Sequence, residues 1–213
     1  MDRNYLVRIS AWGVLLALTA CGAERNVPGE QAATQSEAGE RLEPAEASLR
    51  AHATISGPPG SGIKGEVTFV QLKENLPAPG VEIEARITAP ASELASGPHG
   101  LHIHENAKGG CVPPYESAEG HFDPGPSGNS DPDVNHPFHT GDIPNLMVDQ
   151  NGAGSMKATT SRITLSPGPL TVFDADGSVI IVHENPDRGT SGPAKSGVSG
   201  GGRIACGVIE LNR

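Results

Sequence analysis

The chain has few aromatic residues and no long apolar segment with a helical period. Aromatic residues make up 3% of its 213 positions, whereas glycine occurs 28 times and proline 19 times. These features argue against a mainly helical protein and favour an all-β domain with many turns. The length suits one domain of ordinary size, with residues left over for targeting or a linker.

Positive charge is also scarce. Fifteen Lys and Arg residues face 25 Asp and Glu residues, which gives a formal net charge of −10. Such a balance argues against a nucleic-acid partner and offers no general attraction to anionic lipids.

The N-terminal region lacks an apolar run long enough to span a bilayer, but it has the parts of a secretory signal peptide over residues 1–20. A short basic region precedes the apolar run 9–17. Leu18-Thr19-Ala20-Cys21 then resembles a bacterial lipobox with Cys21 as the lipidated residue; the alternative is an ordinary signal peptide. Because Gly22 follows, we expect an exported, lipid-anchored protein of the cell envelope, on the periplasmic face of the outer membrane if the source is Gram-negative.

A lipid-linked tether over residues 21–49 and a folded domain over residues 50–213 are expected next. The tether has almost no large apolar residues and cannot offset its ordering entropy. The domain has short β-type runs and two long loops, 106–142 and 184–202. We predict a Greek-key β-sandwich or flattened barrel of about eight antiparallel strands with two functional loops. The predicted runs are 51–55, 65–72, 81–87, 99–105, 146–148, 155–159, 170–173, 178–183 and 203–211.

Two cysteines, Cys111 and Cys206, remain once Cys21 is set aside. A signal peptide places them in an oxidising compartment, so a disulfide between them is the economical interpretation. It would contribute roughly 4–5 kcal/mol in the chain-entropy model. The alternative is two unpaired buried thiols.

Histidine is concentrated in the middle of the chain, where six of eight histidines lie between positions 99 and 139. In a strand over 99–105, His102 and His104 would point to the same face, about 7 Å apart, and could reach one metal ion. Paired histidines also occur on solvated strands, so this pair alone is weak evidence.

Five motifs in a fixed order make the domain resemble the copper/zinc superoxide dismutases of the secreted bacterial type. The resemblance covers about residue 50 to the C-terminus and implies a β-sandwich fold. It also implies conversion of superoxide to O₂ and H₂O₂ by Cu(II)/Cu(I) cycling, with zinc as a structural and tuning ion. The motifs are HGLHIHE from His99, GHFDP around His121, HTGDIPNL from His139, IVHENPD around His183 and GGGRIACGVI near the end.

The same resemblance implies that His121 bridges copper and zinc and takes part in catalysis. Arg203, three residues before Cys206, would bind the superoxide anion. Lys195 and Arg188 are expected to add local positive charge near it. The implied copper ligands are His102, His104, His121 and His183.

The zinc site departs from the family pattern. The family usually has a histidine about eight residues after the bridging one, and here that position is Asn129. His136 lies in the same loop and could complete a tetrahedral site; the alternatives are a three-ligand site or no zinc. Asp187 matches a carboxylate that links a copper histidine to a zinc histidine. The zinc ligands implied by the resemblance are His121, His139 and Asp142.

Three other functions explain the sequence less well than dismutation does. An inactive dismutase-like module that buffers copper in the envelope predicts a missing copper ligand or a missing arginine, and neither is missing. A copper chaperone would more often carry Met-rich or C-x-C motifs, but the chain has three Met and no such pair. Zinc-dependent hydrolysis does not explain His183, Arg203 and the disulfide together. The expected partners are superoxide and a membrane, and the protein is expected to be a monomer or a homodimer.

Overall fold

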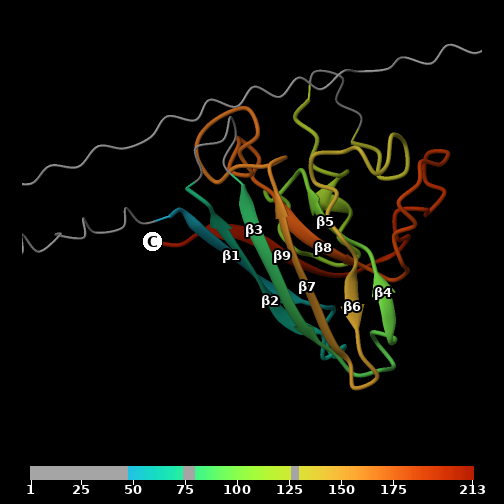
Figure 1. The fold of residues 1–213 in the computed structure, drawn as a ribbon. Helices are drawn as coiled ribbons and strands as arrows, with labels where there is room; N and C mark the ends of the chain where they lie inside the picture. Colours follow the sequence, from blue (N-terminus) through green and yellow to red (C-terminus); the bar gives the residue numbers. More distant parts are fainter. Residues whose placement is uncertain (1–47, 74–79, 126–129) are drawn as a thin grey trace, which may run out of the picture. The chain divides into compact units, whose positions relative to one another are not determined.

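The computed structural model describes residues 48–73, 80–125 and 130–213, and no helix in these ranges has the length and apolarity of a membrane span. The predicted signal peptide, Cys21, Asn129 and nearly all of the tether lie outside them. The described strands form one nine-stranded sheet in the order β4-β6-β7-β3-β2-β1-β9-β8-β5, with every neighbouring pair antiparallel (Figure 1). The strands are β1 (Arg50–Ser56), β2 (Lys64–Gln71), β3 (Val81–Thr88), β4 (Gly97–His99), β5 (Leu101–His104), β6 (Leu146–Val148), β7 (Ala153–Thr160), β8 (Val179–His183) and β9 (Arg203–Leu211).

The sheet curves into a nearly closed barrel. Its two edge strands, β4 and β5, are separated in the sequence only by Gly100, so the two edges meet. Strands that are neighbours in space are often distant in the chain, as in the pairing of β3 with β7 and of β1 with β9. This connectivity confirms the predicted all-β Greek-key class.

Two strand predictions need correction. The run 99–105 is not one strand, because the chain leaves β4 at His99 and begins β5 at Leu101. The run 170–173 is not a strand; Thr171 makes only an isolated bridge with Thr164. Apolar alternation over four residues cannot distinguish a strand from a buried turn segment.

Alternation fills the barrel interior. In β3 the residues Val81, Ile83, Ala85 and Ile87 are buried, while the residues between them are more exposed. Strand β5 is buried on both faces: Leu101 and Ile103 join the core cluster, so His102 and His104 lie on the outer face. That outer face is therefore covered by loops rather than by solvent.

The covering loop is fixed to the barrel by a disulfide. Cys111, from the loop after β5, bonds to Cys206 on β9, as predicted. A second apolar cluster of Tyr115, Ala118, Val179, Ile181 and Cys206 packs between this loop and the outer face of β8 and β9. The disulfide and this cluster together hold the histidine-bearing loop against the sheet.

Candidate metal centre

Short backbone bridges bring the long loop onto the outer edge of β5. His121 pairs with His104, and Asp142 pairs with His102, each in an isolated antiparallel bridge. The amide of Ile103 also donates to the carbonyl of Gly141 at 3.0 Å. His121 and Asp142, 21 positions apart in the sequence, therefore flank the same four-residue strand.

Four histidines form the first cluster. His102 and His104 come from β5, His183 ends β8, and His121 comes from the loop, and one ring nitrogen of each lies within 4.8 Å of the others. All four side chains are buried, and His183, at 2% exposure, is the most accessible.

Hydrogen bonds at the opposite ring nitrogens fix how these imidazoles face the cluster. His104 Nδ1 donates to the carbonyl of Glu119 at 3.0 Å, and His183 Nδ1 donates to the carbonyl of Gly201 at 3.1 Å. This leaves their Nε2 atoms, each with a free lone pair, only 3.4 Å apart. His102 Nδ1 and His121 Nε2 are buried without a hydrogen-bond partner among the described residues. Two such lone pairs in a dry site repel each other, and a shared cation removes that repulsion.

Burial keeps these rings neutral. It lowers the pKa of His102 and of His121 to about 4 each, and that of His183 to about 3. Burial also lowers the pKa of His104 well below its ordinary value. Neutral imidazoles with convergent lone pairs are metal ligands, and four of them suit copper.

The second cluster shares His121 and adds His136, His139 and Asp142. His121 Nδ1 lies 2.6 Å from Asp142 Oδ1, and the Nδ1 atoms of His136 and His139 lie 3.2 and 3.1 Å from Asp142 Oδ2. Three histidines and one carboxylate match the donors of a tetrahedral zinc site. The structure therefore brings His136 together with His121, His139 and Asp142.

The electrostatics of this second cluster are opposite to those of the first. Burial alone would lower the pKa of His136, but the carboxylates of Asp142 and Asp187 outweigh it and raise that pKa to about 9. Burial alone would also lower the pKa of His139, but the carboxylate of Asp142 outweighs burial and raises that pKa. Burial alone would raise the pKa of Asp142, but hydrogen bonds from the three histidines hold it well below its usual range. The carboxylate is thus ionised and suited to a divalent cation.

Arg203 lies beside the first cluster on β9. Its Nη1 donates to the carbonyl of Tyr115 at 2.7 Å, and its Nη2 donates to the carbonyl of Glu119. A cavity of about 590 Å³ is lined by Arg203, His183 and Lys195, so the cluster opens toward solvent on the arginine side. The prediction for Arg188 was wrong: it lines a different groove, with Arg162 and Asn145.

Sequence reasoning missed the carbonyl of Glu119, which accepts hydrogen bonds from both His104 and Arg203. Glu119 adopts φ 58° and ψ −141°, a region that favours glycine. The Glu-Gly-His order at 119–121 gives no signal of this role, because the acting atom belongs to the backbone.

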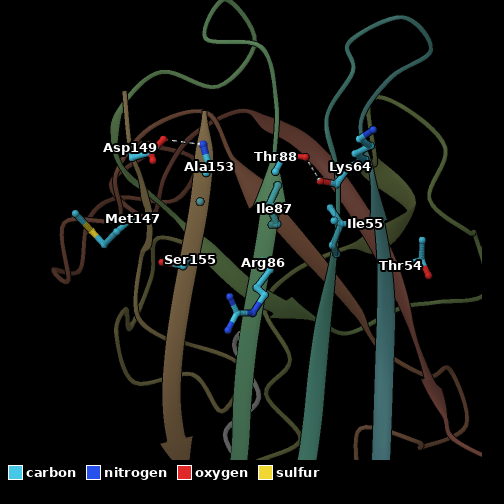
Figure 2. Close-up of a pocket in the computed structure, with 12 residues that line it drawn as sticks. Thr54, Ile55, Lys64, Arg86, Ile87, Thr88, Met147, Asp149, Ala153 and Ser155 are labelled. Atoms are coloured by element: carbon cyan, nitrogen blue, oxygen red, sulfur yellow. Dashed lines mark hydrogen bonds between the residues drawn. The ribbon is translucent and has the colours of Figure 1, made fainter. Parts of the chain in front are cut away.

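A larger groove on the outer side of the barrel, about 720 Å³, contains no histidine (Figure 2). Figure 2 shows side chains from neighbouring strands around it, including Lys64, Arg86, Met147 and Asp149. No residue that lines this groove belongs to the two histidine clusters.

Comparison with known proteins agrees with this geometry. A model of the copper/zinc superoxide dismutase family matches residues 63–209. The chain belongs to this family. The curated copper/zinc superoxide dismutase of Deinococcus radiodurans is 38% identical over 138 residues, which cover 60% of this chain and 71% of that protein. That of Legionella pneumophila is 34% identical over 153 residues, covering 68% of this chain and 77% of that protein.

The fold also matches a solved structure. The crystal structure of the clock protein EA4 superposes with a TM-score of 0.57 at 28% sequence identity, covering 80% of this chain and 99% of that one. Both metals of the family fit the residues of this chain, since an all-nitrogen set and a three-nitrogen, one-carboxylate set share His121.

Proposed function

We propose that the protein is a superoxide dismutase that holds copper and zinc. The observation that carries the proposal is the convergence of four neutral, buried histidine nitrogens, one of them from His183, which lines a cavity together with a fixed arginine. The net reaction combines two superoxide ions and two protons into O₂ and H₂O₂. Family membership supports the same activity.

The proposed copper ligands are the four members of the first cluster, and the proposed zinc ligands are those of the second. Bound there, copper supplies one-electron redox chemistry by alternating between Cu(II) and Cu(I), and zinc supplies positive charge beside His121. The atoms proposed to bind copper are His102 Nδ1, His104 Nε2, His121 Nε2 and His183 Nε2; the proposed zinc ligands are His121, His136, His139 and Asp142.

Arg203 binds the substrate. Two backbone carbonyls fix its guanidinium at the cavity wall, so its charge and remaining N–H groups are already oriented for a small anion. Lys195 lines the same cavity and adds positive charge at its mouth. Local attraction is needed because the whole chain carries a formal charge of −10.

His121 handles a proton. Its Nδ1 is fixed against Asp142, while its Nε2 is buried and faces the first cluster. Whenever Nε2 is not bound to metal, the ring can hold a proton there and release it to the reduced product, and bulk water supplies the second proton through the open cavity. Asp187 orients His102 at the ring nitrogen opposite the proposed copper-binding one, because its Oδ2 accepts a hydrogen bond from His102 Nε2 at 3.1 Å.

A module that only stores copper would need the histidines but not Arg203. The two carbonyls that fix the guanidinium, and its place in the cavity beside His183, favour dismutation over storage. All four residues of the proposed copper cluster are histidines, whose side chains can bind copper.

The test is metal content and turnover measured on the same full-length protein. After loading with Cu(II) and Zn(II), we expect one copper and one zinc per chain by mass spectrometry, with fast superoxide decay in pulse radiolysis. His121→Ala should reduce turnover by about 100-fold or more, as loss of a group acting in proton transfer does. Copper bound in full without accelerated decay would support storage instead.

We also propose export and lipid anchoring through Cys21. The lipobox-like residues 18–21 support it, and so does the Cys111–Cys206 disulfide, which needs an oxidising compartment. In cells fed labelled palmitate, the wild type should carry the label and sediment with membranes. Cys21→Ser should lose both properties, and an unlabelled wild type would contradict the proposal.

A further inference from the structure

The two long loops are joined by one buried carboxylate outside both histidine clusters. Asp133, three residues before His136, is 3% exposed. Its Oδ2 accepts a hydrogen bond from the amide of Gly197 at 2.7 Å. Its Oδ1 accepts two from Ser199, from the amide at 3.1 Å and from Oγ at 2.8 Å. All three donors belong to the loop between β8 and β9.

That loop segment carries much of the cavity wall. Lys195 precedes Gly197 by two residues, and Arg203 follows Ser199 by four. Between them, the carbonyl of Gly201 accepts the hydrogen bond from His183 Nδ1. A shift of this segment would therefore move the substrate-binding charges and one proposed copper ligand together.

The chain fits closely against His183 at this point. Gly200 has φ +117°, and a Cβ there would lie 2.7 Å from the Cβ of His183. The segment can approach the histidine only with a glycine and only along one path. Backbone hydrogen bonds from Arg188 to Val198 and from Asn185 to Gly200 hold the chain on that path, and Asp133 adds an anchor on the N-terminal side.

A carboxylate at position 133 is unexpected in a cavity that would admit an anion. Asp133 itself lines the cavity, where a negative charge opposes the approach of an anionic substrate. Burial alone would raise its pKa, but the hydrogen bonds from Gly197 and Ser199 outweigh this and lower it. The Asp133 carboxylate is unfavourable for substrate attraction, and both its oxygens accept hydrogen bonds from the chain. Its role in the cavity is therefore structural.

We propose that Asp133 is a positioning residue, whose carboxylate fixes the 197–201 segment and through it His183, Lys195 and Arg203. Since His136 lies on the same turn, Asp133 also couples the proposed zinc loop to the copper side of the site. The inference rests on the proposed function only for its effect on turnover, because the anchoring itself is a property of the chain.

The test uses Asp133→Asn in the full-length protein, with Asp149→Asn as the matched control. Asp149 also accepts backbone hydrogen bonds, from Asn151 and Ala153, but it lies in the turn between β6 and β7. In hydrogen exchange, the Gly197 and Ser199 amides should exchange about 10-fold faster in Asp133→Asn, the factor expected for loss of a charge-assisted hydrogen bond. Asp149→Asn should leave them unchanged.

The second readout is the Cu(II) electron paramagnetic resonance spectrum together with kcat/KM. We expect Asp133→Asn to change the copper hyperfine coupling and to lower kcat/KM by about 10-fold while copper content stays complete. Ser199→Ala, a milder change, should shift both readouts in the same direction, and combining the two substitutions should give less than the product of their effects.

Unchanged exchange at Gly197 and Ser199 would overturn the anchoring. Faster exchange with the wild-type spectrum and rate would overturn the positioning of the site. A wild-type protein without dismutase activity would instead contradict the proposed function, while exchange and the copper spectrum would still decide the role of Asp133. Should Asp133→Asn not fold, Ser199→Ala alone decides by the same readouts.

Discussion

His136 Nε2 lies 2.6 Å from Asp187 Oδ1, and the other oxygen of the same carboxylate lies 3.1 Å from His102 Nε2. Hydrogen bonds from these two histidines outweigh the effect of burial and hold the pKa of Asp187 below its usual range. One carboxylate therefore orients a histidine of each cluster. A histidine three residues before His139 can serve this network because the loop turns it toward Asp187.

This relationship predicts that His136 is needed for zinc but not for copper. His136→Asn should weaken zinc binding by about 100-fold or more, since even the loss of an outer hydrogen-bond partner costs 10–100-fold. Copper should remain bound, because its four histidines are untouched. Chelator competition with metal analysis gives both affinities. His52→Asn, a histidine on β1, is the control and should change neither affinity. Full zinc affinity in His136→Asn would show that zinc does not use this residue.

Asp187 should affect both metals. Asp187→Asn retains the shape but cannot accept two hydrogen bonds at full strength, so we expect both copper and zinc affinities to fall by about 10–100-fold. The same chelator competition measures the change. Asp176→Asn is a suitable control, because that exposed carboxylate pairs with Lys108 on the surface. A decrease confined to copper would mean that Asp187 does not support the proposed zinc site.

Arg203 should control the rate rather than metal binding. Arg203→Ala should lower kcat/KM by about 10–1000-fold, the range over which charge focusing raises association rates, and the remaining rate should depend less on salt. Arg203→Lys should recover part of the rate, since a lysine keeps the charge but not the two fixed carbonyl contacts. Pulse radiolysis at several ionic strengths measures both effects. Arg188→Ala, outside this cavity, should have a far smaller effect. Loss of copper from Arg203→Ala would contradict a role limited to the substrate.

Whether a site residue could be predicted from the sequence depends on whether its side chain or its backbone takes part in the site. The proposed copper ligands act through side chains that lie in motifs resembling those of the family, so His102, His104, His121 and His183 could be named from that resemblance. His136 could be proposed only as one of several possibilities, because spacing does not show how a loop turns. The carbonyls of Glu119 and Gly201 could not be predicted, because every residue has a carbonyl and only the fold selects the one that acts.

The fold shows the same division. The alternation of Val81, Ile83, Ala85 and Ile87 predicted β3 because one face of that strand is buried. The separation of β4 from β5 at Gly100 could not be predicted, because the break is set by the closure of the barrel and not by the local residue pattern. Arg188 was misplaced for a similar reason: its position in the loop between β8 and β9 does not show which side of the loop it faces.

Backbone conformation at Glu119 gives a stability prediction. A non-glycine residue at φ 58° and ψ −141° costs roughly 1–3 kcal/mol, and glycine avoids most of this. Glu119→Gly should be more stable than Glu119→Ala by about 1–2 kcal/mol. Both variants lose the side-chain hydrogen bond from Asn106, so the comparison isolates the backbone. Thermal unfolding measures the difference. Glu119→Gly should also stay active, because the carbonyl that holds His104 and Arg203 is retained; equal stability of the two variants would contradict the strain.

The copper cluster predicts how the metal-free protein responds to acid. The pKa values of His102 and His121 are about 4, and that of His183 is about 3, against about 6.5 in an unfolded chain. Between pH 6.5 and 4 the unfolded chain therefore binds more protons than the folded one, and stability falls as pH falls. The slope is about 1.4 kcal/mol per pH unit for each histidine that stays neutral.

Other titrating groups leave the upper part of this window, above about pH 5, to the copper-cluster histidines. His136, whose pKa is about 9, contributes stability that is complete below pH 6.5 and is lost only as the pH rises through 9. Asp142 and Asp187 have lowered pKa values, so their contribution is complete above about pH 5 and is lost as the pH falls below it. Urea unfolding of metal-free protein at pH 4.5, 5.5 and 6.5 measures the slope. His183→Asn removes one buried imidazole and should make the slope shallower, whereas a wild-type slope of zero would show that the folded and unfolded chains take up protons equally and that folding does not lower these pKa values.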